Sequence, residues 1–133
     1  MSLDVAPGLI AQAERGEVDE AEFVATVARS LPYAWSVMSG LAQDVAAGFL
    51  NTEGFADDAT PPPSEAERGQ LLRALASDAI RGALERHFGV RFAFQNCCRV
   101  AAFRPEDVES DRYLEFVSVR SQVLNQSPAL KDC

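Results

Sequence analysis

Three cysteines and one histidine are the side chains of this sequence with the greatest capacity for chemistry. Cys97 and Cys98 are adjacent, His87 precedes them, and Cys133 ends the printed sequence. Thiolate and imidazole are ligands that zinc prefers, but structural zinc sites use C-x₂₋₄-C pairs, which this sequence lacks. Neighbouring cysteines in a strand would also point to opposite faces. The spacing therefore predicts no metal site.

A Cys–His nucleophile is a second kind of chemistry that these residues could supply, with His87 as the base that activates Cys97 or Cys98. Such a pairing is spatial, so the sequence alone does not establish it. The competing interpretation places His87 in the last turn of a helix, where the helix dipole favours a protonated imidazole. One of the two cysteines would then pack in the core as a small apolar residue. We favour this packing interpretation.

Carboxylate pairs are frequent, but they fall at expected helix starts or in a loop. Capping and solvation explain pairs such as Asp19 with Glu20 and Glu106 with Asp107 without catalysis. The sequence contains no P-loop, no G-x-G-x-x-G, no G-x-S-x-G and no H-E-x-x-H. We therefore lean against an enzyme, and no cofactor is implied.

The charge of the chain is strongly one-sided. The net charge is −8, and residues 1–58 hold ten acidic and two basic side chains, whereas residues 59–133 hold ten of each. A nucleic-acid-binding protein normally shows a basic footprint, so we expect no nucleic acid partner. The acidic half would repel an anionic membrane and attract a basic protein surface, although solubility alone also explains it.

Cellular location follows from cysteine usage and from the lack of targeting signals. An odd number of cysteines without framework spacing is typical of a reducing compartment. The N-terminal residues lack the basic and apolar regions of a signal peptide. No apolar run approaches the length of about 18 residues that a membrane span needs. We expect a cytoplasmic protein.

The hydrophobic periodicity predicts a mainly α fold, with about five helices around one core. Asp19 is an expected N-cap, Ser64 and Glu67 form an S-x-x-E capping box, and Gly89 is an expected helix stop. A short turn is expected at Ser127. The expected helices cover residues 7–15, 20–30, 32–50, 64–88 and 107–125.

Residues 90–103 follow a different pattern from the rest of the chain. Val90, Phe92 and Phe94 alternate with other residues at the period of a half-buried strand, and residues 96–98 could turn the chain into a second strand. This predicts a short antiparallel β-hairpin. A buried helix remains the alternative for so apolar a segment.

The chain is expected to form a single domain, 1–133. An acidic helical half, 1–50, is joined to a second half, 64–133, by a Pro-rich loop, 51–63. Glycine and alanine on the helix faces would permit close packing within a monomer or between copies, so a homo-oligomer is possible.

Two segments carry a resemblance to a known group of proteins. The stretch GQLLRALASDAIRGALERHFGVRFAFQNC, residues 69–97, and the ending LNQSPALKDC, residues 124–133, resemble small actinobacterial proteins of unknown function. The resemblance extends over nearly the whole chain. It implies a source, but no activity, ligand or site residue.

We predict a small cytoplasmic interaction or regulatory module that binds a protein partner with a basic surface. One alternative is a thiol-dependent enzyme or redox sensor that uses Cys97 or Cys98 near His87. A second alternative is a helical domain that binds a small molecule between the hairpin and the long helix.

Overall fold

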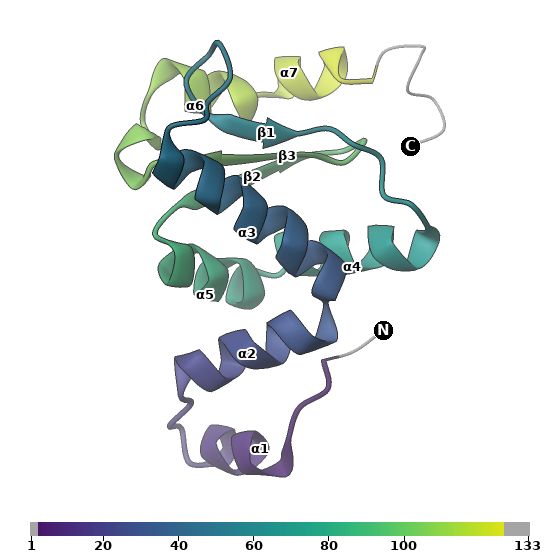
Figure 1. Ribbon diagram of the computed structural model, residues 1–133, viewed down its shortest axis with the longest axis vertical. Coiled ribbons are helices and arrows are strands. Elements are labelled where there is room, and N and C mark those ends of the chain that lie inside the picture. Colours follow the sequence, from purple (N-terminus) through teal and green to yellow (C-terminus); the bar gives the residue numbers. More distant parts are fainter. Residues whose placement is uncertain (1–2, 127–133) are drawn as a thin grey trace.

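The computed structural model (Figure 1) describes residues 3–126, and the expected turn at Ser127 and the candidate Cys133 lie outside this part. The helices are α1 (Pro7–Glu14), α2 (Glu20–Ser30), α3 (Pro32–Ala47), α4 (Glu65–Ala76), α5 (Asp78–Phe88), α6 (Asp111–Phe116) and α7 (Val119–Leu124). The strands are β1 (Ala56–Asp58), β2 (Arg91–Gln95) and β3 (Arg99–Phe103), and a 3₁₀ turn covers Pro105–Asp107. The described part is therefore mainly α with a small sheet, but it has seven α-helices instead of about five.

Side chains that the sequence marks as caps begin several helices. The Asp19 carboxylate accepts from the backbone N–H of Ala21 at 3.0 Å, and the Ser64 hydroxyl accepts from that of Glu67 at 3.3 Å. Each cap satisfies a helix-end N–H that has no partner within the helix. These starts, and the end of α5 at Gly89 with a φ of 69°, agree with the sequence.

The prediction of one helix over 64–88 is wrong, because α4 ends at Ala76 and α5 begins at Asp78. Ser77 lies between them with extended backbone, φ −87° and ψ 116°, and its hydroxyl accepts from the N–H of Ile80 at 3.2 Å. The serine therefore caps a new helix. A Ser-Asp pair within a helical period is a restart signal that the apolar periodicity concealed.

Two other helix predictions also ran too long. Helix α3 ends at Ala47, since Gly48 adopts a left-handed conformation with a φ of 78°, where 32–50 was predicted. The predicted helix 107–125 is divided into a 3₁₀ turn, α6 and α7. Ser110 and Ser118 cap α6 and α7 through the N–H groups of Tyr113 and Ser121. A left-handed glycine therefore ends α3, whereas serine N-caps divide the helix predicted over 107–125.

The predicted hairpin is confirmed, and a third strand joins it. The sheet order is β1-β3-β2, and both pairs are antiparallel. Strand β1 falls inside the segment 51–63, which the sequence predicted to be a loop. A strand of three residues has too few positions to show an alternating pattern, and its pairing with β3 is what defines it.

The sheet separates two apolar clusters, because successive side chains of a strand point to opposite faces. Val100 and Ala102 belong to the larger cluster with α2, α3, α4 and α5, whereas Ala101 and Phe103 belong to a smaller aromatic cluster with Phe116 of α6. Figure 1 shows α6 on the other side of the sheet from α3 and α5. The helices of both chain halves thus cover one sheet.

One long-range polar contact fixes the start of α3. The Gln70 side chain of α4 accepts from the backbone N–H of Tyr33 at 2.7 Å and from that of Ala34 at 3.4 Å. Leu31 precedes α3 and has no capping side chain, so a residue from another helix supplies the cap. Across residues 3–126, no helix combines the length and the hydropathy that crossing a membrane requires.

Candidate functional site

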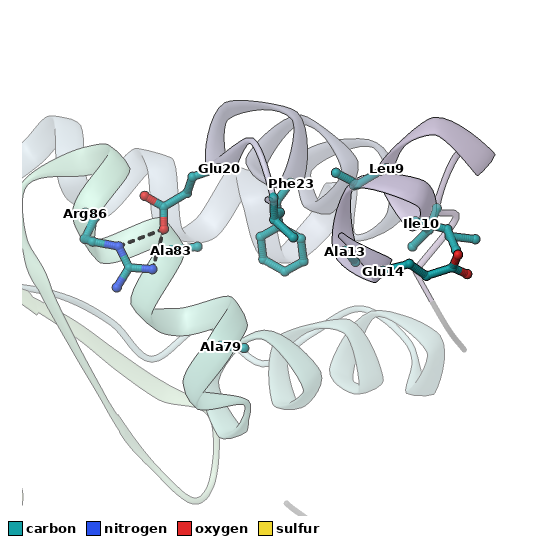
Figure 2. Close-up of a pocket in the computed structure, with 11 residues that line it drawn as sticks. Leu9, Ile10, Ala13, Glu14, Glu20, Phe23, Ala79, Ala83 and Arg86 are labelled. Carbon is teal, nitrogen blue, oxygen red and sulfur yellow. Dashed lines mark hydrogen bonds and ion pairs between the residues drawn. The ribbon is translucent and has the colours of Figure 1, made fainter. Parts of the chain in front are cut away.

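An apolar groove lies where α1, α2 and α5 meet, and it has a volume of about 670 Å³. Figure 2 shows Phe23 of α2 between the α1 side chains at one end and an ion pair at the other, with Ala79 and Ala83 on α5. Ile10 and Val18 remain 47% and 49% exposed. The groove is lined by Val5, Leu9, Ile10, Ala13, Glu14, Val18, Glu20, Phe23, Ala79, Ala83 and Arg86.

The groove stays open because α1 is held mainly by polar contacts and buries little apolar surface against the core. Leu9 is the only side chain of α1 that is buried. Gln12 ties α1 to α2: its Nε2 donates to the Glu22 carboxylate at 3.0 Å, and its Oε1 accepts from the N–H of Asp19 at 2.9 Å. These polar contacts position α1 beside α2 and leave apolar side chains uncovered.

An ion pair between Glu20 of α2 and Arg86 of α5 stands at one end of the groove. The Arg86 Nε donates to the Glu20 carboxylate at 2.7 Å, and a second guanidinium nitrogen contacts the same oxygen. The hydrogen bond from Arg86 lowers the pKa of Glu20 below its usual value; partial loss of solvation opposes this shift, and the positive charge of Arg86 adds a lesser lowering effect. The pair therefore links α2 to α5 above acidic pH.

The surroundings of the groove carry an excess of negative charge. Glu14, Asp19 and Glu22 form no ion pair within the described residues, whereas Arg86 is paired with Glu20. The other cations nearby are also paired: Arg15, which follows α1, contacts Glu17 at 3.9 Å, and Arg29 of α2 contacts Asp4 at 3.7 Å. The apolar surface is thus bordered by uncompensated carboxylates.

The predicted thiol site is at the turn of the hairpin, between β2 and β3. Cys97 and Cys98 both adopt left-handed backbone, with φ of 70° and 62°. Such a conformation costs about 1–2 kcal/mol for a residue with a Cβ, and Gly or Asn is usual there. The pairing of β2 with β3 holds the turn in this conformation.

The two neighbouring cysteines have different environments. Cys98 is 5% exposed and belongs to the larger apolar cluster, and its sulfur accepts from Nη1 of Arg68 at 3.6 Å. The sulfur of Cys97, by contrast, accepts from Nε2 of Gln126 at 3.2 Å. The packed cysteine that the sequence suggested is Cys98.

His87 lies in the last turn of α5, as the sequence predicted, and its side chain contacts aromatic rings. Its ring centroid lies 5.6 Å from that of Trp35 and 4.8 Å from that of Phe88. The cysteines follow the opposite end of β2, and five strand residues at about 3.3 Å each separate the two ends by roughly 16 Å. The fold therefore places His87 and the cysteine turn at different ends of the sheet.

The groove was not predicted as a site, although parts of its lining were recognised as apolar. The helical period of 20–30 places Phe23 on an apolar stripe, and that of 64–88 places Ala79 and Ala83 on the side expected to be buried. The available signal was an excess of apolar residues in 5–18, beyond what so short a helix can bury. Which helix those residues would face depends on tertiary packing.

The fold and the groove define a small, mainly α domain with a three-stranded antiparallel sheet and an open apolar groove between helices. The chain belongs to the KH_NucS_shadow family, described as NucS shadow ORF, whose family model matches residues 1–133. Comparisons with curated proteins and with solved structures find no match.

Proposed function

We propose that this protein is an interaction module that binds an amphipathic, basic helix of a partner protein in the groove between α1, α2 and α5. The observation that carries the proposal is the groove itself, which is apolar inside and has Glu14, Asp19 and Glu22 around it, three carboxylates without an ion pair among the described residues. Exposed apolar patches of this kind mark interaction sites more often than chance exposure does.

The walls of the groove indicate what kind of segment would fit. They are helices, so the groove offers no free strand edge for an added strand, and helix-in-groove binding is the appropriate mode. Glu14 lies at the α1 end of the groove, whereas Glu20 at the α5 end is already paired with Arg86 (Figure 2). A partner helix with one apolar face flanked by Lys or Arg would complement both the apolar floor and the unpaired carboxylates around it.

Two synthetic peptides test this proposal on the whole protein. Both would carry the same Leu- and Ala-rich helical face, one with Lys and Arg at its ends and the other with Glu. We expect the basic peptide to bind, with an affinity that falls as salt rises, and the acidic peptide not to bind. Equal binding of the two peptides, or binding of neither, would contradict the proposal.

Two variants locate the binding surface. Ile10→Asp places a charge in the groove at a half-exposed position that folding should tolerate, whereas Phe49→Asp changes a side chain that is 73% exposed and does not line the groove. We expect Ile10→Asp to abolish binding of the basic peptide and Phe49→Asp to leave it unchanged. An equal effect of the two substitutions would place the peptide elsewhere.

A nucleic-acid-binding function is the second candidate, and the name of the family raises it. KH modules clamp four nucleotides with a G-x-x-G loop, which this sequence lacks. The favourable observation is a hollow of about 340 Å³ beside β2 that contains Arg81 and Arg91. However, Arg81 pairs with Asp78 at 2.6 Å and Arg91 with Glu85 at 3.8 Å, which leaves little net charge for phosphates.

A single-stranded oligonucleotide at low salt distinguishes the two functions. We expect no binding in a fluorescence anisotropy titration with wild-type protein. Binding that Arg91→Glu removes would favour the second candidate over the first.

We further propose that the protein acts in the cytoplasm of an actinobacterium. The Arg-rich, Lys-poor composition supports the actinobacterial source.

A further inference from the structure

A further hollow, between the sheet and α7, contains a buried acceptor without a hydrogen-bond partner among the described residues. Gln95 ends β2 and is 2% exposed. Its Nε2 donates to the backbone carbonyl of Phe116 at 2.8 Å, and this contact fixes which end of the amide is the oxygen. Within residues 3–126 its Oε1 has no hydrogen-bond partner. A buried carbonyl oxygen without a hydrogen bond is energetically costly, so binding of a ligand that donates a hydrogen bond to it is favoured.

The surroundings of Gln95 form a defined site. Gln95 lies directly opposite Arg99 in the β2–β3 register, and both side chains are on the face that carries Ala101 and Phe103. With residues of α7 they line a hollow of about 250 Å³. The lining from α7 and the residue after it consists of Ser121, Leu124 and Asn125.

Arg99 is held rigidly and its charge is compensated. Its Nε and Nη2 donate to the Asp57 carboxylate at 3.1 and 3.0 Å, and its guanidinium carbon lies 5.0 Å from the centroid of the Phe116 ring. Those contacts use two of its three nitrogens. The guanidinium disfavours a cationic ligand and the Asp57 carboxylate disfavours an anionic one, so the hollow suits a neutral molecule.

We propose that this hollow binds a small neutral molecule that carries a secondary amide, such as a lactam. The amide N–H donates to Oε1 of Gln95, and the amide carbonyl accepts from Arg99. Leu124, which is 61% exposed, covers the apolar part of the ring. This site is separate from the groove between α1, α2 and α5, so either proposal can fail without the other.

The test is an NMR titration of the whole protein with 2-pyrrolidinone and, separately, with N-methyl-2-pyrrolidinone. The two probes share a ring and a carbonyl, but only the first has an N–H. We expect 2-pyrrolidinone to shift the side-chain amide signals of Gln95 and Asn125 in a saturable manner, with the methylated probe binding about tenfold more weakly or not at all. Equal responses, or none, would show a hydrated hollow only and would overturn the proposal.

A pair of variants assigns the contact to Gln95. Gln95→Met keeps the length of the side chain and removes the acceptor, whereas Gln43→Met makes the same change at an exposed position of α3. We expect only Gln95→Met to weaken 2-pyrrolidinone binding by about tenfold. Unchanged binding to a folded Gln95→Met protein would overturn the assignment, and if that variant does not fold, the comparison of the two probes on the wild type still decides.

Discussion

The groove and the aromatic face of the sheet are assembled from different interactions. In the groove region, α1 buries one side chain and is held by Gln12, whereas on the sheet face Phe103 is fully buried against other rings. The centroids of Phe55 and Phe103 are 4.5 Å apart, and those of Phe103 and Phe116 are 5.7 Å apart. Dense packing gives a rigid frame, and sparse packing leaves apolar surface available to a partner.

The largest expected effect is on the aromatic face. Phe103→Ala removes a side chain that is 0% exposed and contacts three other rings, so we expect the free energy of unfolding to fall by about 3–5 kcal/mol. Urea denaturation followed by circular dichroism measures it. Phe49→Ala, at a position 73% exposed, is the matched control and should change stability by less than about 0.5 kcal/mol. Similar losses in both variants would remove the distinction between the regions.

An intermediate effect is expected in the local stability of α1. Because Leu9 is its one buried side chain, the amide protons of α1 should exchange with solvent through local opening, faster than those of β3. Hydrogen–deuterium exchange measured by NMR gives both rates. A basic peptide bound in the groove should slow exchange in α1 and leave β3 unchanged. Equal protection of α1 and β3 in the free protein would show that α1 is part of the rigid frame.

The smallest effect concerns the exposed pair that links α2 to α5. The pKa of Glu20 is lowered in the folded state, so its contribution is present above its usual value of 4.5 and is lost as pH falls through the lower folded value. We expect an NMR titration of the Glu20 carboxyl to show this low pKa, and Arg86→Gln to raise it toward 4.5. An unchanged Glu20 titration in Arg86→Gln would exclude the pair as the cause.

The local features of the chain were determined by the sequence itself. Asp19, Ser64 and Gly89 mark helix boundaries because each satisfies or relieves a backbone group within a few residues. The alternation in 91–95 likewise predicted a strand, since period two is a local property. The class of fold followed from these signals. The concentration of negative charge in residues 1–58 is likewise a property of the sequence alone.

Tertiary structure decided what depends on contacts between distant segments. Strand β1 exists because residues 56–58 pair with β3, and the start of α3 is capped by Gln70, more than thirty residues later. The separation of His87 from Cys98 depends on their positions at opposite ends of β2. The groove arises because α1, α2 and α5 come together with apolar side chains left uncovered between them, and local periodicity contains no information on how separate helices meet.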